Sequence, residues 1–359
     1  MNPTTPDILV VGAGVAGLTS ALALHREGAR VKVIDQGRPG REASWAGGGI
    51  LCPLYAWRYP DPVLDLAVLG MRRYPDLIDS LRAETDPERF VSGMRILDPT
   101  SQGETTEAIG RRLGHFGIRH EWLDRPDPAG PALSLPEVAN VRNPRLLRAL
   151  LETAAVEGIE IRGDLSCTGL TVRGDRVEGV ETESGPVRAG AVVVAAGAWS
   201  RTLIPRSRPD SIFPVRGQML RLAPGAAEGL PGILMERGTY LIPRLDGAVI
   251  IGSTVEHAGF DKSVDRAAQQ ALHRHAIEMH PPLGDAAVTH RWAGLRPGSA
   301  DEVPVLGAHP EIRGLWANTG GYRNGLAMAP ATAAVLADLM AERLPPVDAT
   351  PYRLERILA

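Results

Sequence analysis

Three glycines and one acid near the start of the chain have the spacing of a dinucleotide-binding turn. Gly12, Gly14 and Gly17 form a G-x-G-x-x-G motif, and Asp35 follows 18 residues after Gly17. In such a turn the first glycine permits the bend, the second lets backbone approach a pyrophosphate, and the third lets a helix pack closely on a sheet. The helix N-terminus faces the phosphates, and the acid accepts hydrogen bonds from ribose hydroxyls. The alternative is a glycine turn that serves packing alone.

The flanking residues predict the elements that this turn requires. Ile8–Val11 is a β-branched apolar run typical of a buried parallel strand. Residues 18–27 are strong helix formers and Gly28 can end that helix, while Val31–Ile34 predicts a second strand that ends at Asp35. The result is one βαβ unit. It binds the ADP portion that NAD and FAD share, so the turn alone does not choose between these cofactors.

The rest of the chain predicts a mixed α/β protein. Prolines, glycines and aspartates cluster over residues 99–136, which indicates loops around short elements. Apolar spacing predicts helices at 144–157, 264–279 and 326–343, and strands at 170–182, 187–196, 219–222, 240–243, 248–251 and 314–318. Because no repeat, low-complexity tract or clear linker separates these elements, we expect any two domains to be interleaved along the chain.

Composition narrows the class of protein. A length of 359 residues suggests about two domains, and 44% hydrophobic residues provide a large core. The 39 basic and 42 acidic residues leave a net charge of −3, which argues against nucleic-acid binding. Two cysteines, Cys52 and Cys167, cannot build a disulfide framework and favour a reducing cytoplasm. Residues 1–7 lack the basic flank of a secretion signal, and no apolar run of membrane-spanning length is present, so we expect no membrane association.

Two further kinds of site find no support in the sequence. The nine histidines are scattered, and His273 and His275, the one close pair, would point to different faces of a helix. We therefore expect no metal. Ser44 and Ser200 lack the strand–turn–helix setting of a nucleophilic serine, which argues against hydrolase chemistry.

Six motifs in order along the whole chain resemble one known family. Besides the glycine turn and Asp35, they are Ser44-Trp45-Ala46-Gly47-Gly48-Gly49, VVVAAGAWS at 192–200, WAGLRPGS at 292–299 and YRNGLAMA at 322–329. Together they resemble the D-amino-acid oxidase family of flavoenzymes, and within it the glycine oxidase branch of the thiamine pathway. The resemblance implies a glutathione-reductase-like Rossmann FAD domain (1–90, 140–212 and 288–359) and a smaller mixed-sheet α+β substrate domain (91–139 and 213–287).

The resemblance also implies which residues hold FAD. Val15 and Ala16 would lie at the pyrophosphate, Asp35 and Gln36 near the adenosine ribose, and Cys167 near the adenine. Three consecutive glycines suggest backbone crowded against the cofactor, and the alternative is a flexible surface loop. The full expected set is Gly12, Gly14, Val15, Ala16, Gly17, Asp35, Gln36, Ala43, Ser44, Gly47, Gly48, Gly49, Ile50, Cys167, Gly197, Trp199, Gly321, Tyr322, Arg323, Asn324, Gly325, Leu326 and Ala327.

Three residues are expected at the substrate. An amino-acid oxidase must hold a carboxylate, and the planar fork of arginine makes two parallel charge-assisted hydrogen bonds to one. The resemblance assigns this clamp to Arg296, a second hydrogen bond to the Tyr240 hydroxyl, and a place beside the flavin to Arg323. The alternatives are a solvated charge or a loop staple for each arginine, and a half-buried core aromatic for Tyr240.

Four other residues were weighed against these roles. His257 is a candidate base, but a loop histidine held by hydrogen bonds is the favoured interpretation. Met235 is favoured as core filler over a pocket wall. Cys52 does not match the attachment position of covalent family members, so we expect non-covalent FAD. Gly321 departs from the pattern, since glycine oxidases commonly carry histidine there, and its small size predicts a larger site.

These expectations define one function and two rivals. The resemblance implies FAD-dependent oxidative deamination of glycine, small N-substituted glycines or D-amino acids, which gives glyoxylate or a 2-oxo acid, an amine or ammonia, and hydrogen peroxide. The partners would be a small amino acid and dioxygen, and a homo-oligomer is compatible with the family. The rivals are a D-amino-acid dehydrogenase that passes electrons to a quinone or protein, and a non-catalytic flavoprotein subunit.

Overall fold

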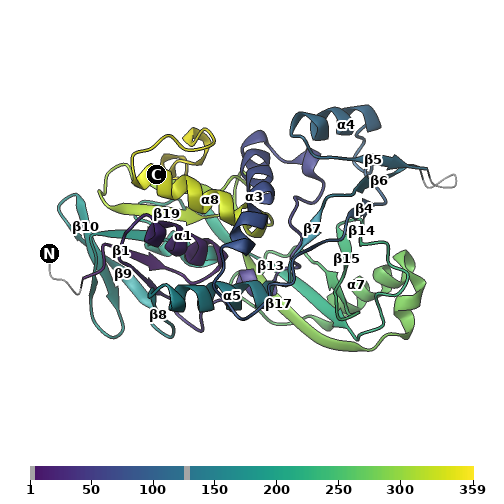
Figure 1. Ribbon diagram of the computed structural model, residues 1–359, viewed down its shortest axis with the longest axis horizontal. Coiled ribbons are helices and arrows are strands. Elements are labelled where there is room, and N and C mark those ends of the chain that lie inside the picture. Colours follow the sequence, from purple (N-terminus) through teal and green to yellow (C-terminus); the bar gives the residue numbers. More distant parts are fainter. Residues whose placement is uncertain (1–4, 125–129) are drawn as a thin grey trace.

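Two large β-sheets side by side form the frame of the protein in the computed structural model, which describes residues 5–124 and 130–359 (Figure 1). The first has six strands, in the order β18 (Val305–Ala308), β19 (Leu315–Thr319), β12 (Ala191–Val194), β1 (Ile8–Val11), β2 (Val31–Ile34) and β8 (Glu160–Arg162). The second has eight, in the order β17 (Val288–Ser299), β13 (Ile212–Leu222), β16 (Val249–Gly252), β15 (Thr239–Pro243), β14 (Ile233–Glu236), β4 (Met94–Ile96), β6 (Ala132–Leu135) and β5 (Glu121–Leu123).

Smaller elements complete the described part of the chain. A three-stranded sheet contains β11 (Val187–Arg188), β10 (Arg176–Thr182) and β9 (Cys167–Arg173), and a two-stranded sheet contains β3 (Phe90–Val91) and β7 (Ala139–Asn140). The helices are α1 (Val15–Arg26), α2 (Ala43–Ala46), α3 (Asp61–Asp79), α4 (Thr106–His115), α5 (Asn143–Val156), α6 (Ser200–Leu203), α7 (Arg266–Met279) and α8 (Gly325–Met340). None of these helices is long and apolar enough to cross a membrane.

The six-stranded sheet contains the predicted βαβ unit. β1 pairs in parallel with β2 on one side and with β12 on the other, and α1 makes the crossover between β1 and β2. Only the edge strand β18 runs antiparallel to its neighbour, β19. Because parallel strands end at the same edge, the glycine turn after β1 lies beside the loops that follow β12 and β19.

The eight-stranded sheet is mostly antiparallel, and its longest pairing joins β13 to β17. α7 packs against this sheet (Figure 1). The largest buried apolar cluster contains Val10 and Val33 of the first sheet together with Met219 and Ile242 of the second. The two sheets therefore share one core, which fixes their relative position.

The sequence predicted α1, α5, α7 and α8 and the strands β1, β2, β15, β16 and β19 to within a few residues. It did not predict α3, α4, β17 or most of the short strands, and residues 170–182 form the hairpin of β9 and β10 and not one strand. Residues 187–196 likewise form two strands, β11 and β12, of different sheets. α3 contains Gly70 and an internal Pro75, both unfavourable in helices. Gly70 is explained by packing, because a Cβ there would overlap with the carbonyl of Ala327 at the start of α8. β17 lies in the eight-stranded sheet, although its residues fall in the range expected for the cofactor domain, and the exact division into domains stays a prediction.

Candidate active site

A cavity of about 410 Å³ is lined by residues of both large sheets. One end is formed by the glycine turn after β1 together with Asp35 and Cys167. The other end is formed by Tyr240 and Arg296 of the eight-stranded sheet. The cavity thus joins the two groups of residues that the sequence analysis singled out, one for a dinucleotide and one for a carboxylate.

The glycine turn has the backbone geometry that close approach of a phosphate requires. Gly12 has φ +110°, a conformation that L side chains rarely adopt, and a Cβ there would overlap with the carbonyl of Ala195. A Cβ at Gly17 would overlap with the carbonyl of Gly12, so this glycine serves the packing of α1 on the turn, as predicted. Gly14 is the N-cap residue of α1 and offers no side chain there. The positive end of the helix therefore faces the cavity through small residues.

Asp35 has a second role besides the predicted one. Its Oδ2 accepts from the backbone N–H of Ala13 (2.7 Å) and its Oδ1 from that of Gly37 (3.0 Å). Burial raises the pKa of Asp35, and these two N–H donors oppose that effect. Each oxygen keeps a free lone pair, and Asp35 lines the cavity, so the carboxylate can brace the glycine turn and still accept from a ribose hydroxyl.

The three consecutive glycines are enclosed by protein. Gly49 has φ +85°, and a Cβ there would overlap with the carbonyl of Val141. A Cβ at Gly47 would lie 2.9 Å from Nδ2 of Asn143, which donates to the carbonyl of Ser44 (2.6 Å). The structure therefore rejects the flexible-loop alternative. Asn143 is a residue that sequence reasoning missed. Its Oδ1 is buried without a hydrogen-bond partner at the cavity wall.

A buried arginine, Arg244, holds this glycine segment through hydrogen bonds. Arg244 donates to the carbonyls of Gly48 (2.7 Å) and Val141 (3.0 Å) and to Oδ1 of Asn140 (3.1 Å). Burial lowers the pKa of Arg244 to about 10, and the charge of Arg142 contributes to this effect. In the part of the chain that the structure describes, no carboxylate forms an ion pair with Arg244. A buried guanidinium costs free energy to desolvate, and here three oxygens from two segments of the chain compensate that cost. Arg244 was not predicted.

Tyr240 is held between two glycines. A Cβ at Gly252 on the neighbouring strand β16 would lie 2.5 Å from its ring, and a Cβ at Gly48 would lie 3.2 Å away. Tyr240 is 5% exposed and lines the cavity. This packing is compatible with the alternative interpretation of Tyr240 as a core aromatic residue. Its place on the cavity wall also suits the predicted role.

Arg296 lies on β17 and lines the same cavity. Its Nη1 donates to the carbonyl of Thr254 (3.1 Å) and its Nη2 to Oγ of Ser253 (2.5 Å). Burial lowers the pKa of Arg296, Tyr240 raises it, and the charge of Arg323 lowers it. Its hydrogen-bond acceptors are one carbonyl and one hydroxyl, and within residues 5–124 and 130–359 no carboxylate forms an ion pair with it. Arg296 is only partly exposed, which argues against a solvated charge. Its bonds to Ser253 and Thr254 fit the loop-staple alternative as well, so the clamp role stays a prediction.

Arg323 and Gly321 lie in the turn before α8. Tyr322 has φ +43° and its N–H donates to the carbonyl of Pro297 (3.0 Å), which ties the turn to β17. A Cβ at Gly321 would lie 2.7 Å from the Cα of Gly325. A side chain there would point at the turn itself, so the glycine makes the turn compact and does not by itself enlarge the cavity.

The cavity brings together nearly all of the predicted site residues. The three expected at the substrate line it, as do those expected at the cofactor except Gly17, Asn324 and Ala327. The expected site did not include the other lining residues, although Cys52 was weighed there and several lie within the quoted motifs: Val11, Glu42, Ala46, Cys52, Leu54, Asn143, Ala195, Ala196, Ala198, Thr202, Leu203, Gly217, Met219, Gly294, Leu295, Pro297, Pro304, Asn318, Thr319, Gly320, Met328 and Thr332. Many of these are apolar strand or loop residues without a motif.

Residues that were weighed and set aside mostly lie elsewhere. Met235 is fully buried and does not line the cavity, and His257 is exposed beside the ring of Phe213 (5.9 Å between centroids). Cys52 does line the cavity, and burial raises its pKa to about 12, which keeps the thiol protonated and unreactive. Over residues 5–124 and 130–359 no group of metal-binding side chains occurs.

This arrangement fits FAD. Glycine backbone and a helix N-terminus suit a pyrophosphate, and Asp35 suits a ribose. A family model described as "FAD dependent oxidoreductase" matches residues 7–339. The chain belongs to this family. Its cofactor is accordingly FAD.

Some of the similar proteins are named as glycine oxidases. The chain is 44% identical over 357 residues to a glycine oxidase from Pseudomonas aeruginosa, which covers 96% of this chain and 97% of that protein. It is 32% identical to a bifunctional protein ThiO/ThiG from Synechocystis, of which 52% is covered.

Solved structures show the same fold. The crystal structure of glycine oxidase from Geobacillus kaustophilus matches with a TM-score of 0.88 at 27% identity, covering 99% of this chain and all of that one. Iminodiacetate oxidase from Chelativorans matches with a TM-score of 0.85 at 27% identity, covering 96% and 98%. The predicted fold class, a Rossmann-type FAD domain with a smaller mixed-sheet domain, is confirmed.

Proposed function

We propose that this enzyme oxidises glycine, small N-substituted glycines or small D-amino acids with FAD and dioxygen. For glycine, the balanced reaction consumes one dioxygen and one water and yields glyoxylate, ammonia and hydrogen peroxide. The names of the similar oxidases support this substrate class. A small amino acid and dioxygen are thus the proposed partners.

One observation carries the proposal from the structure. Arg296 is a largely enclosed guanidinium that lines the cofactor cavity, and its hydrogen-bond acceptors, a carbonyl and a hydroxyl, are uncharged. A buried charge without a counterion is costly, and a bound substrate carboxylate would supply that counterion. A non-catalytic flavoprotein subunit has no need of such a cation beside its cofactor.

The roles of the chain's own residues follow from their positions. Arg296 binds the substrate carboxylate, and Tyr240 donates a second hydrogen bond to it, so that the Cα–H faces the cofactor ring. Arg323 lies where it can bind the substrate or a ring carbonyl. FAD, when bound, would supply the two-electron oxidation of the substrate, with dioxygen as the final electron acceptor. No protein base is required if the substrate amine arrives unprotonated.

An anaerobic spectral titration tests this function. Glycine, sarcosine and D-alanine are added to the purified holoenzyme, and at least one of them should bleach the flavin absorbance. In air, each turnover should release one hydrogen peroxide per substrate. A yellow protein that none of the three reduces would contradict the proposal.

The rival dehydrogenase differs in its electron acceptor. Stopped-flow mixing of the reduced enzyme with dissolved oxygen distinguishes the two, because an oxidase reoxidises quickly without a dye or quinone. The proposal includes a cytoplasmic location, which the free thiols of Cys52 and Cys167 support. A homo-oligomeric state and the absence of nucleic-acid binding stay predictions.

A further inference from the structure

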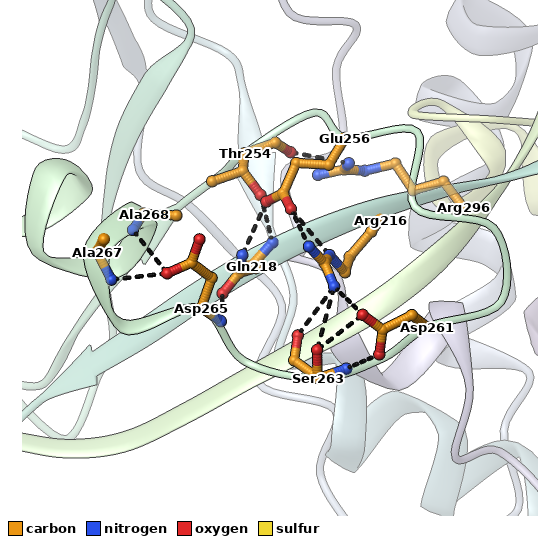
Figure 2. A network of polar contacts seen from close by, with 10 residues as sticks. All are labelled: Arg216, Gln218, Thr254, Glu256, Asp261, Ser263, Asp265, Ala267, Ala268 and Arg296. Carbon is orange, nitrogen blue, oxygen red and sulfur yellow. Dashed lines mark hydrogen bonds and ion pairs between the residues drawn. The ribbon is translucent and has the colours of Figure 1, made fainter.

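The loop that holds the guanidinium of Arg296 is itself held by a network of charged side chains (Figure 2). Residues 253–265 join β16 to α7, and they supply Ser253 and Thr254, the two acceptors of Arg296. Since neither acceptor is charged, the direction of the guanidinium depends on where this loop lies. We call residues 253–265 the clamp loop.

Glu256 ties the clamp loop to β13. Nε and Nη2 of Arg216 donate to Oε2 of Glu256 (2.8 and 2.5 Å), and the backbones of the two residues exchange hydrogen bonds of 2.8 and 3.0 Å. The other oxygen of Glu256 accepts from Nε2 of Gln218 (2.8 Å). The side chain of Arg216 is only 11% exposed. Hydrogen bonds between ionised groups are about twice as strong as neutral ones, so these contacts hold Glu256 in one position against β13.

Gln218 carries this constraint to Thr254. The backbone N–H of Gln218 donates to Oγ1 of Thr254 (2.9 Å), so the residue whose carbonyl accepts from Arg296 is also fixed through its side chain. Oε1 of Gln218 accepts from the N–H of Asp265 (2.8 Å), at the far end of the loop. Gln218 is fully buried and therefore fastens both ends of the clamp loop to β13.

The same network engages the acids of the clamp loop. Asp261 binds Nη1 of Arg216 (2.6 Å), and Asp265 caps α7 by accepting from the N–H groups of Ala267 and Ala268. Burial raises the pKa of Glu256, but hydrogen bonds from Thr254, Gln218 and Arg216 outweigh burial and hold that pKa below its usual value. Glu256 is thus ionised at neutral pH and paired with Arg216, which leaves Arg296 available to an incoming carboxylate.

We propose that Glu256 is a positioning residue for substrate binding, which aims Arg296 through Arg216, Gln218 and the carbonyl of Thr254. The inference deepens the proposed function and rests on it, because it assumes that Arg296 binds the substrate carboxylate. It assigns to the clamp loop a specific task, which is to present an already oriented guanidinium and so reduce the cost of ordering it when substrate binds.

The test uses holoenzyme variants and acetate, a ligand that offers a carboxylate without an amine. Glu256→Gln keeps the shape of the side chain and removes its charge. We expect the Kd for acetate, measured by perturbation of the flavin spectrum, and the KM for glycine to rise about tenfold, while kcat changes less than about twofold. Asp261→Asn is the matched control, because it removes a charge from the same Arg216 at a site that is 54% exposed, and it should leave both constants within about twofold.

A thermodynamic cycle with Arg296→Leu shows whether Glu256 acts through the clamp. In the Arg296→Leu background, Glu256→Gln should no longer change the Kd for acetate. A purely structural role would lower the melting temperature or the yield of holoenzyme and leave the Kd of the folded fraction unchanged. If Glu256→Gln does not fold, Thr254→Val replaces it in the same measurements. This variant keeps the carbonyl of residue 254 and loses the hydroxyl that binds Gln218.

The outcomes separate the two proposals. If Arg296→Leu weakens acetate binding and Glu256→Gln does not, the positioning role is wrong and the proposed function stands. The positioning role is also overturned if Glu256→Gln raises the Kd for acetate by the same factor in the Arg296→Leu background. If Arg296→Leu leaves acetate binding and the KM unchanged, the clamp itself is wrong, and the inference is overturned with it.

Discussion

The guanidinium of Arg296 lies against the Cα of Gly217 on the neighbouring strand β13. A Cβ at that position would overlap with the guanidinium carbon and with both of its terminal nitrogens. Gly217 also lines the cavity, so it forms part of the wall of the site and leaves the space that the side chain of Arg296 occupies. Any side chain there must displace the residue proposed to bind substrate.

Gly217→Ala should therefore weaken substrate binding. The new methyl group moves the guanidinium away from Ser253 and Thr254, and we expect the KM for glycine to rise at least tenfold, about 1.4 kcal/mol. Steady-state kinetics measures the KM, and a melting curve shows whether the fold persists. Gly169→Ala is the control, because nothing lies within 4 Å of a Cβ there. An unchanged KM would show that the position of Arg296 tolerates displacement.

Replacement of Arg296 distinguishes charge from geometry. Arg296→Leu should cost about 2–5 kcal/mol of substrate binding, since the carboxylate then has no buried partner. Arg296→Lys keeps the charge but loses the planar fork, and it should recover only part of that binding. The measurement is kcat/KM for glycine in both variants. Equal activity of the lysine variant and the unaltered enzyme would contradict a bidentate clamp.

Arg244→Met should release the glycine segment next to the proposed flavin site. Three buried acceptors, the carbonyls of Gly48 and Val141 and Oδ1 of Asn140, lose their donor, at about 1–3 kcal/mol for each unsatisfied group. We expect a lower melting temperature and weaker binding of FAD, measured by fluorescence titration of the apoprotein. Arg237→Met is a control, since the side chain of Arg237 is 70% exposed. FAD binding equal to that of the unaltered protein would exclude a role for Arg244 in the cofactor site.

The ion pair of Arg58 and Glu104 predicts a pH dependence of stability. Burial opposes ionisation of Glu104, but hydrogen bonds from Arg58 and from backbone N–H groups lower its pKa to about 2. A carboxyl whose pKa is lower in the folded protein stabilises it above the unfolded pKa, near 4.5, and that contribution is lost as the pH falls toward 2.

Melting curves of Glu104→Gln and the unaltered protein measure this contribution. The variant should melt at a lower temperature at pH 6, and the difference should shrink between pH 4.5 and 2. Glu121→Gln is a suitable control, because its ion pair with Arg119 is long (3.4 Å) and exposed, and such surface pairs contribute little to stability. A constant difference at all pH values would show that the charge of Glu104 does not stabilise the fold.

The cofactor half of the site was largely predictable because its residues are close together in sequence. The spacing of Gly12, Gly14 and Gly17 predicted a strand, a turn and a helix, and the structure contains them. Asp35 was predicted from its distance along the chain, but its bonds to the N–H groups of Ala13 and Gly37 were not. Such bracing depends on how the turn folds back on the next strand.

The supporting residues could not be predicted because they act across long sequence separations. Arg244 reaches the carbonyl of Gly48, 196 residues away, and Gly217 is explained only by the side chain of Arg296. α3 was not predicted because Gly70 and Pro75 are unfavourable in helices. The close approach of Gly70 to the carbonyl of Ala327, far away in sequence, explains why a glycine stands in this helix. Tertiary packing decided each of these positions.

The polypeptide returns several times to each of the two large sheets before it reaches α8 (Figure 1). A single genetic crossover would therefore cut through both halves and separate residues that must line one cavity. Swapping of whole substrate modules is a poor route to a new specificity in such a protein. Diversification must instead proceed by point changes at residues of the cavity wall such as Met219 and Leu54. Laboratory evolution of this enzyme should begin at those two positions.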